Sequence, residues 1–395
     1  MKWASAISEH RLLKYAVAEC VAEIKEALDR QSVDLIITFV SPHYATNFND
    51  LHGLVSELLG KGMLIGCSGG GVIGAGREVE QGPGVAMTAA VLPDVSLSLF
   101  HIEESNLPDG DAPPETWEST VGVSASDEPD MLILADPFSI KAEDLLAGLD
   151  YAFPRGARIG GLASGGDQRT PYVLFANDSV YQTGAVGVAM FGNIKVDTVV
   201  AQGCRPIGRR MQITSCATNI LQELDGRPSL EVLKELFQDL TERDRQLAQQ
   251  SLFLGLVMDT FNEEPELGDF LIRNIIGIDA RVNGLVIGAI IKEGQRVQFH
   301  LRDAYTSAHD LTEMLQRYKR SSQWSNSETG ALLFQCLGRG SYLYGHPDHD
   351  TNMFLDNVGW MPLTGFFCNG EIGQVAGSTY LHGYTSSFGI IKPSY

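Results

Sequence analysis

Residues 63–74 read Met63-Leu-Ile-Gly-Cys-Ser-Gly-Gly-Gly-Val-Ile-Gly74, and this stretch decides the fold. Its first half is a short apolar run that predicts a buried strand, and its second half is a loop of small residues. An earlier apolar run, Asp34-Leu-Ile-Ile-Thr-Phe-Val40, predicts another buried strand. Between the two runs, the spacing of Phe48, Leu51, Val55 and Leu58 predicts a helix. Strand, helix, strand and glycine loop in this order are typical of an α/β fold.

The same order of elements occurs again further along the chain. Asp130-Met-Leu-Ile-Leu-Ala135 predicts a strand, residues 142–153 predict a helix, and Arg158-Ile-Gly-Gly-Leu-Ala-Ser-Gly-Gly166 predicts a strand with a small-residue loop. We therefore predict an internal duplication of the strand-helix-strand unit in the N-terminal domain. Broken apolar runs at 85–102 and 184–201 follow the two units and predict strand pairs or hairpins.

The pattern changes after Gly203. Ser229 suits a helix N-cap before an apolar helical pattern, and residues 270–303 alternate strands with turns. Two more apolar runs, 330–340 and 365–373, again end in small residues. The predicted fold class is α/β, with mixed sheets and flanking helices. We expect an N-terminal helix within residues 1–30, a first domain over 31–225 and a second α/β domain over 226–395.

Composition and charge exclude several classes of protein. The formal charge is 29 minus 49, or −20, so the chain lacks the basic face of a general nucleic-acid binder. Residues 83–150 hold 14 acidic residues and one basic residue, which gives −13 in this segment alone. No apolar run approaches the roughly 20 residues of a membrane span, and no signal peptide is evident, so we expect a cytoplasmic protein without membrane insertion. Six cysteines without C-x-x-C spacing indicate reduced thiols.

Glycine is unusually frequent, with 42 residues in 395 against a usual share of about 7%. Much of it stands at predicted strand ends, where glycine lets a ligand approach backbone N–H groups. In α/β sheets ligands bind beyond the carboxyl ends of the strands. We therefore predict that three strand-end loops line one ligand pocket, through Cys67, Ser68, Gly69, Gly161, Ser164, Cys368, Asn369 and Glu371. Arg205 is the candidate clamp for a carboxylate ligand.

Other interpretations of these residues remain open. The glycines also suit tight corners without any ligand, and none of the loops has the spacing of a nucleotide motif. Cys67 or Cys368 at a strand end could serve as a nucleophile if a base lies within hydrogen-bond reach. His346-Pro-Asp-His349 offers potential metal ligands at a nonstandard spacing. A haem pocket with one axial histidine is a further alternative that spacing cannot identify.

Several motifs resemble the FIST family of sensory domains. The N-terminal part is similar to the FIST N domain in four motifs: Ile65-Gly-Cys-Ser-Gly-Gly-Gly-Val-Ile73, Ile159-Gly-Gly-Leu-Ala-Ser164, Gly184-Ala-Val-Gly-Val188 and Gln202-Gly-Cys-Arg-Pro-Ile207. The C-terminal part is similar to the FIST C domain in four others: Asp269-Phe-Leu-Ile-Arg-Asn-Ile-Ile-Gly-Ile-Asp279, Phe299-His-Leu-Arg-Asp-Ala304, Gly365-Phe-Phe-Cys-Asn-Gly-Glu-Ile-Gly373 and Leu381-His-Gly-Tyr-Thr-Ser-Ser-Phe388.

The resemblance implies a sensor of small ligands, proposed to include amino acids. Relatives are fused to output modules, whereas the resemblance fills residues 30–390 of this chain and leaves no room for one. It therefore implies a separate signalling protein as partner. Some relatives are reported to bind haem and to sense nitric oxide, so the cofactor is left open between none and haem. We expect a non-enzymatic ligand sensor, with a haem-based gas sensor and a cysteine-dependent enzyme as alternatives.

Overall fold

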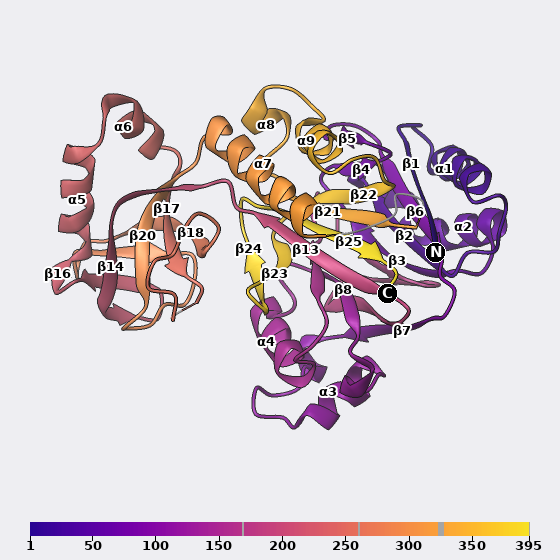
Figure 1. Cartoon of the computed structure of the whole chain (residues 1–395), viewed down its shortest axis with the longest axis horizontal. Helices are drawn as coiled ribbons and strands as arrows, with labels where there is room; N and C mark the ends of the chain where they lie inside the picture. Colours follow the sequence, from indigo (N-terminus) through magenta and orange to yellow (C-terminus); the bar gives the residue numbers. More distant parts are fainter. Residues whose placement is uncertain (168–169, 260, 323–327, 395) are drawn as a thin grey trace. The chain divides into compact units, whose positions relative to one another are not determined.

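The chain forms two compact units. The computed structural model describes residues 1–167, 170–259, 261–322 and 328–394. One unit combines Met1–Val200 with Met314–Tyr395, and the other is Ala201–Glu313, so the second unit interrupts the first in sequence. Mixed sheets with flanking helices confirm the predicted α/β class (Figure 1). The predicted sequence domains 31–225 and 226–395 cut across these compact units and stay a prediction.

The first unit is built from three repeats of one strand-helix pattern. The first repeat comprises β1 (Lys2–Ser8), α1 (Leu13–Ala27), β2 (Leu35–Val40), η1 (Pro42–Asp50), α2 (Leu51–Leu59), β3 (Met63–Ser68), β4 (Val72–Gly74), β5 (Arg77–Val79) and β6 (Val85–Val91). The second comprises β7 (Val95–Ile102), α3 (Pro114–Val121), β8 (Asp130–Ala135), α4 (Ala142–Ala152), β9 (Arg158–Leu162), β10 (Leu174–Ala176), β11 (Ser179–Tyr181) and β12 (Ala185–Gly192). The third comprises β13 (Lys195–Ala201), α7 (Ala304–Ser321), β21 (Gly330–Cys336), α8 (Ser341–Tyr344), α9 (His349–Asn357), β22 (Leu363–Cys368), β23 (Glu371–Val375), β24 (Ser378–His382) and β25 (Ser386–Lys392).

The predicted duplication is thus confirmed, and a third copy extends it. The sequence pattern did not reveal this copy because residues 202–303, which carry the strands of the barrel, separate its first strand, β13, from its first helix, α7.

Each repeat contributes a hairpin to the sheet of another repeat. The three sheets have the strand orders β1-β6-β2-β3-β10-β11, β7-β12-β8-β9-β23-β24 and β13-β25-β21-β22-β4-β5. In each one, two central strands run parallel and the hairpin of another repeat pairs antiparallel with the second of them. Figure 1 shows the consequence, with β4 and β5 from the N-terminal part lying beside the yellow and orange strands of the third repeat. None of the three sheets is therefore complete without a second repeat.

The inner faces of the three sheets share one apolar core. Phe39 of β2 stacks on Phe366 of β22 with ring centroids 4.7 Å apart, and Phe334 of β21 packs edge-on against both rings. Leu132 and Val186 extend the same core into the second sheet. Separate apolar clusters cover the outer faces, for example that of α1 and α2 on the first sheet. Because both faces of the central strands are buried, these strands are continuous apolar runs rather than alternating ones.

Three local expectations were wrong. Residues 85–102 and 184–201 contain two strands each, but β6 and β7 belong to different sheets, as do β12 and β13. Both edges of β6 are already occupied, by β1 and β2, so β7 cannot pair with it. The helix expected within residues 1–30 is α1, and a strand that was not expected, β1, precedes it. Ser229 is the first residue of α5 (Ser229–Asp239) rather than its cap, and its hydroxyl donates to the carbonyl of Leu221.

The second compact unit is a small antiparallel barrel. Its strands are β14 (Arg205–Ala217), β15 (Ile220–Leu224), β16 (Arg227–Pro228), β17 (Leu252–Val257), β18 (Phe270–Asp279), β19 (Gly284–Ile287) and β20 (Arg296–Leu301), with helices α5 and α6 (Glu242–Ala248). Strands β14-β20-β17-β18-β19-β15 pair in this order, and β15 also pairs with β14, which closes the sheet. Closure removes the free edges that an open antiparallel sheet would expose.

Three glycines occupy the same position in the three repeats. Gly66, Gly160 and Gly365 lie opposite Thr38, Ile133 and Leu333 in the parallel strand pairs. A Cβ at any of the three would overlap the carbonyl oxygen of that partner. The close approach of the two central strands therefore requires glycine in every repeat.

We predict that Gly66→Ala and Gly365→Ala each lower the free energy of unfolding by about 3 kcal/mol, because the backbone must shift to admit a methyl group. Gly53→Ala on α2 is the matched control, since a Cβ there meets nothing within 4 Å. It should raise stability by up to about 1 kcal/mol. Urea unfolding followed by tryptophan fluorescence measures both, because Trp3, Trp117 and Trp360 belong to the first unit. If Gly66→Ala and Gly365→Ala were as stable as Gly53→Ala, the close approach of the central strands would not require glycine.

Candidate functional site

The three strand-end loops meet and are joined by a cycle of hydrogen bonds. The loop after β9 donates from the Ser164 amide to the carbonyl of Ser68 in the loop after β3, at 3.1 Å. The loop after β22 donates from the Asn369 amide to the carbonyl of Leu162, also at 3.1 Å. The Ser164 hydroxyl completes the cycle, since it accepts from the Gly70 amide at 2.8 Å and donates to the carbonyl of Phe367. Each loop therefore positions the next.

The hairpin that each sheet receives from another repeat also forms hydrogen bonds at these strand ends. The amides of Ser68, Leu162 and Phe367 donate to Val173, Gly370 and Gly71, at 2.9, 2.9 and 3.0 Å. The acceptor in each case immediately precedes or begins the hairpin that another repeat supplies. The loop conformations thus follow from the exchange of hairpins between repeats.

The structure brings eight of the nine predicted site residues together in this region and shows which of them are accessible. The side chains of Cys67, Ser68, Ser164, Cys368 and Glu371 are buried. Asn369 is exposed and its side-chain amide donates to the carbonyl of Ala163 at 2.8 Å. Gly69 and Gly161 are buried as well. Only the tips of the loops are therefore open to a ligand.

Apolar side chains border the exposed loop tips. Gly70 and Gly165 are partly exposed, and Leu337 is close enough that a Cβ on Gly70 would lie 2.6 Å from its Cδ2. Phe138, which follows β8, is 80% exposed and packs edge-on against Tyr172. Tyr172 in turn lies against Gly166 of the second loop. Sequence reasoning missed Phe138, Tyr172 and Leu337, although each lies close to a predicted strand end.

The two candidate nucleophiles are poor ones in this setting. Burial raises the pKa of both Cys67 and Cys368 well above the ordinary thiol value, and the nearby Glu371 carboxylate raises that of Cys368 further. The Cys368 thiol points to the carbonyl of Gln335 at 3.4 Å and to Oε1 of Glu371 at 3.7 Å. Because the thiolate is the nucleophilic form, this environment does not favour covalent catalysis.

Arg205 lies in the second compact unit, whereas the other eight residues belong to the first. Its guanidinium pairs with Asp244 and approaches Asp303, with Nε 3.6 Å from Oδ2. A ligand carboxylate would have to compete with these two side chains, so the role of clamp stays a proposal.

A buried charged cluster lies beneath α8 and α9 of the third repeat. The guanidinium of Arg339 donates to Asp350 through Nε at 2.7 Å and Nη2 at 3.2 Å, and both side chains are fully buried. Burial alone would raise the pKa of Asp350, but Arg339 and the hydrogen bonds from His349 and Ser386 hold it below its ordinary value. Asp350 therefore stays ionised.

Glu78 on β5 faces this cluster from another repeat. Its Oε1 accepts from the Thr351 amide of α9 at 3.0 Å, and its Oε2 is buried without a hydrogen-bond partner. Burial, chiefly, and then the charge of Asp350 raise the pKa of Glu78 to about 8. Glu78 is thus protonated near neutral pH. The sequence signals only that acids flank this strand, in Arg77-Glu-Val-Glu80.

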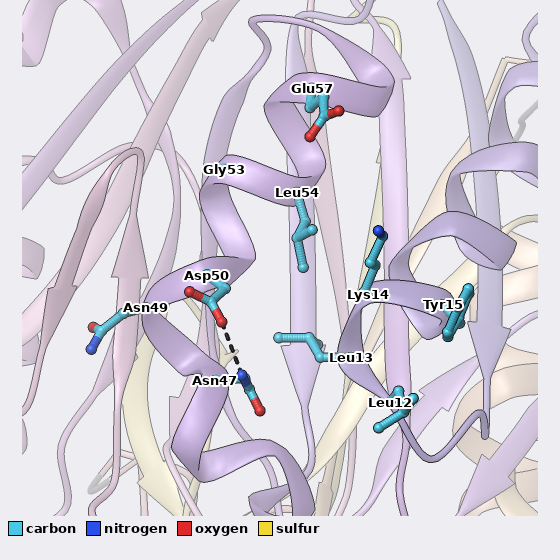
Figure 2. Close-up of a pocket in the computed structure, with 10 residues that line it drawn as sticks. All are labelled: Leu12, Leu13, Lys14, Tyr15, Asn47, Asn49, Asp50, Gly53, Leu54 and Glu57. Carbon is cyan, nitrogen blue, oxygen red and sulfur yellow. Dashed lines mark hydrogen bonds between the residues drawn. The ribbon is translucent and has the colours of Figure 1, made fainter.

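Both units carry cavities. One of about 600 Å³ lies between the start of α1 and the consecutive helices η1 and α2. Figure 2 shows Leu13 and Leu54 along it, with Asn47 bonded to Asp50 at 2.9 Å. A second, of about 400 Å³, lies on the barrel beside Arg210 and Arg296. A third, also of about 400 Å³, is lined by Glu78 and Asp348, and a fourth, of about 570 Å³, by His52 and Asn177.

These cavities do not fit a haem. The one that holds a histidine, His52, has Met63 as its one large apolar side chain among the described lining residues and is also lined by Ser56, Lys61 and Asp178, where a haem needs an apolar slot on both faces. His349 of the predicted metal motif is bonded to Asp350 at 2.8 Å and stacked on Tyr344. Among the described residues, no group of three or more metal-ligand side chains could hold a metal ion. No helix in the described ranges is long and apolar enough to cross a bilayer.

We predict that Ser164→Ala lowers the free energy of unfolding by about 2–4 kcal/mol, since it leaves the Gly70 amide and the Phe367 carbonyl without their shared partner. Ser126→Ala, which removes an exposed hydroxyl from a surface turn, is the matched control and should change stability by less than about 0.5 kcal/mol. Urea unfolding compares the two. A Ser164→Ala protein as stable as the control would show that the cycle of loops contributes nothing.

Glu78 predicts a specific pH dependence. Its folded-state pKa of about 8 is above its value in the unfolded chain, so the folded state binds the proton more tightly. This stabilisation is complete below about pH 4.5 and is lost as the pH rises through 8. Glu78→Gln mimics the protonated acid, so its melting temperature relative to the parent protein should rise steadily between pH 6 and 8. Parallel curves for the two proteins would contradict the buried protonated state.

Comparison with known proteins places the chain in a family. Residues 34–227 match the model of the FIST N domain and residues 229–374 that of the FIST C domain. Two uncharacterized proteins of Mycobacterium tuberculosis are similar to the chain. One is 33% identical over 378 residues and the other 30% over 377, and the matches cover 96% and 95% of both partners. An F-box/LRR-repeat protein of Arabidopsis thaliana is 26% identical over 311 residues, which cover 67% of this chain and 58% of that protein.

A solved structure also aligns with the whole chain. It is a cyanuric acid hydrolase of A. caulinodans, with 7% identity and a TM-score of 0.39 over 100% of both chains, and this likeness supports no conclusion on function. FIST domains are associated with signal transduction and small-ligand sensing. The two domain models together cover most of the sequence, and the chain therefore belongs to the FIST family.

Proposed function

We propose that this protein is a non-enzymatic sensor of a small ligand, and that the ligand binds over the three joined strand-end loops. The observation that carries the proposal is the meeting of one glycine-containing loop from each repeat at a single exposed point. Loops at the carboxyl ends of strands are where α/β folds place their ligands. The buried residues of the predicted set shape this point, and the exposed loop tips would contact the ligand.

The chemistry of the loop tips supports an amino acid or another small carboxylate. Asn369 is exposed, and a primary amide carries two N–H groups, of which one bond to Ala163 uses one. Gly165 is partly exposed, and a backbone N–H group in such a turn can receive a carboxylate, whereas the Gly70 amide is already bonded to Ser164. Phe138 and Tyr172 would pack against the apolar part of the ligand.

The sensory role proposed for this protein implies a separate signalling protein as its partner. We place the protein in the cytoplasm, which suits recruitment of such a partner. The buried, protonated thiols of Cys67 and Cys368 do not favour the enzyme alternative, and the polar cavity at His52 does not favour haem.

A thermal-shift screen with the twenty amino acids and short dicarboxylates tests the proposal. A ligand that binds only the folded protein raises its stability by about 2.7 kcal/mol at a hundred times its Kd, so at least one compound should raise the melting temperature in proportion to the logarithm of its concentration. An absorbance spectrum of the purified protein, recorded first, should show no Soret band.

Variants of the loop tips connect the shift to this site. Asn369→Ala and Phe138→Ala should each raise, at least tenfold, the ligand concentration that is needed for the same rise in melting temperature. Tyr151→Ala removes an aromatic side chain that is 60% exposed on α4 and should leave the shift intact. If no compound acts, or if the loop variants respond like Tyr151→Ala, the ligand site proposed here is wrong.

A further inference from the structure

Two reduced cysteines lie opposite each other at the ends of neighbouring parallel strands in the third repeat. Cys336 ends β21 and Cys368 ends β22, and they are register partners in the ladder that joins these strands. The Leu337 amide donates to the carbonyl of Cys368 at 3.2 Å, which fixes this register at the strand ends. Neighbouring strands lie about 4.8 Å apart, within the roughly 4.4 to 6.8 Å that a disulfide spans between Cα atoms.

The two side chains lie on the same face of this sheet. Phe366 and Cys368 of β22 both belong to the inner apolar core. Phe334 of β21 belongs to it as well, and alternation along the strand brings Cys336 to the same face. The thiol of Cys368 lies 3.4 Å from the carbonyl oxygen of Gln335, in the peptide group that leads into Cys336. The Cys368 sulfur is therefore next to its register partner.

The two thiols differ in their exposure to solvent. Cys336 is half-buried, whereas Cys368 is fully buried. Burial chiefly raises the pKa of Cys368, and the charge of a Cys336 thiolate adds to it, as expected of two sulfur atoms close together. A dissolved oxidant therefore reaches Cys336 first. The buried Cys368 is protected from direct oxidation, but it lies beside the product that forms on Cys336.

We propose that Cys336 and Cys368 form a disulfide when the protein meets a hydroperoxide. The Cys336 sulfur attacks one peroxide oxygen, the O–O bond breaks, and a sulfenic acid forms with release of water from hydrogen peroxide. The Cys368 sulfur then attacks the Cys336 sulfur, so that the S–S bond forms as the S–O bond breaks. The leaving hydroxide takes the proton of Cys368 and becomes a second water. Two thiols are thereby oxidised and one peroxide is reduced.

Glu371 is placed to carry the proton of the second step. Its Oε1 lies 3.7 Å from the Cys368 sulfur, and its Oε2 accepts from the Thr385 amide at 3.0 Å, which holds the carboxylate in position. The carboxylate accepts the thiol proton as Cys368 attacks and passes it to the leaving hydroxide. A buried thiol with a raised pKa can thus react without first releasing its proton to solvent.

Mass spectrometry of the full chain tests the proposal without any ligand, so the result does not depend on the proposed function. The protein is treated with a small excess of hydrogen peroxide, its remaining thiols are alkylated, and it is digested with trypsin without reductant. Cleavage after Arg339 separates Cys336, in peptide 321–339, from Cys368, in peptide 340–395. We expect most molecules to yield these two peptides as one cross-linked species, which dithiothreitol separates.

Variants separate the roles of the residues. Cys336→Ser should abolish the cross-link and leave Cys368 reduced, whereas Cys368→Ser should leave Cys336 as a sulfenic acid that dimedone traps. Glu371→Gln should slow formation of the cross-link at least tenfold. Cys216→Ser is the matched control, since this half-buried thiol of the barrel lies opposite Leu221 rather than another cysteine, and it should form the cross-link like the parent protein.

Three results would overturn the proposal. They are a parent protein in which Cys336 stays reduced, one in which Cys336 is oxidised to the sulfinic acid without a cross-link, and one in which Cys368 is linked to Cys67 instead. If the buried Cys368→Ser variant does not fold, the half-buried Cys336→Ser and the parent protein decide, because a cross-link to Cys368 that persists in Cys336→Ser rules out the assigned pair.

Discussion

The hydroxyl of Ser164 lies between the Gly70 amide and the Phe367 carbonyl, and the three-repeat unit depends on the cycle that it completes. Through this one side chain the first and third repeats are joined by a residue of the second. Direct backbone bonds also join the loops, from Ser164 to Ser68, from Asn369 to Leu162 and from Phe367 to Gly71. The three loop conformations depend on one another. Each loop supplies a carbonyl that accepts a bond from a second loop, and each is itself held by a bond to another repeat.

The exchange of hairpins between the repeats is also cyclic. The first repeat completes the sheet of the third, the third completes that of the second, and the second completes that of the first. A break in one hairpin therefore exposes an edge in a different repeat, and the cost spreads through the shared core around Phe39, Phe334 and Phe366. This arrangement places loops from distant segments, 68–71, 162–166 and 367–370, at one point. It also places Glu78 of the first repeat against α9 of the third.

Local patterns in the sequence predicted the strands and their loops well, because a buried strand ending in glycine carries its own signal. Strands were expected at 63–67, at 130–135 and from residue 365 onward, and the structure has them at Met63–Ser68, Asp130–Ala135 and Leu363–Cys368. The partner of a strand is set by long-range topology, and no local pattern encodes it. For that reason the broken apolar run 85–102 predicts a strand pair or hairpin, although its two strands, β6 and β7, belong to two different repeats. The third repeat was missed because an entire barrel interrupts it.

The same holds for the site residues: their local position in the chain was predictable, but their surroundings in the fold were not. The position of Cys67, Ser164 and Asn369 near one another could be expected from their place at strand ends, but their burial could not. The Cys67 side chain is packed in the core and the Ser164 hydroxyl is used in the cycle of hydrogen bonds. Of these three residues, only Asn369 is exposed. The acid pair Glu78 and Glu80 had no distinguishing signal, because acidic residues are common throughout a chain of net charge −20. Their significance arises only when Asp348 and Asp350 are brought to them by the fold.

Residue-resolved hydrogen exchange of the amides of Gly70, Ser164 and Asn369 tests the central claim most directly. If the three loops form one cooperative ring, these amides exchange at similarly slow rates in the parent protein, and Ser164→Ala accelerates all three together. If only the Gly70 amide accelerates, while Asn369 in the third repeat exchanges as before, the loops are independent turns. The account of a single joined site would then be contradicted.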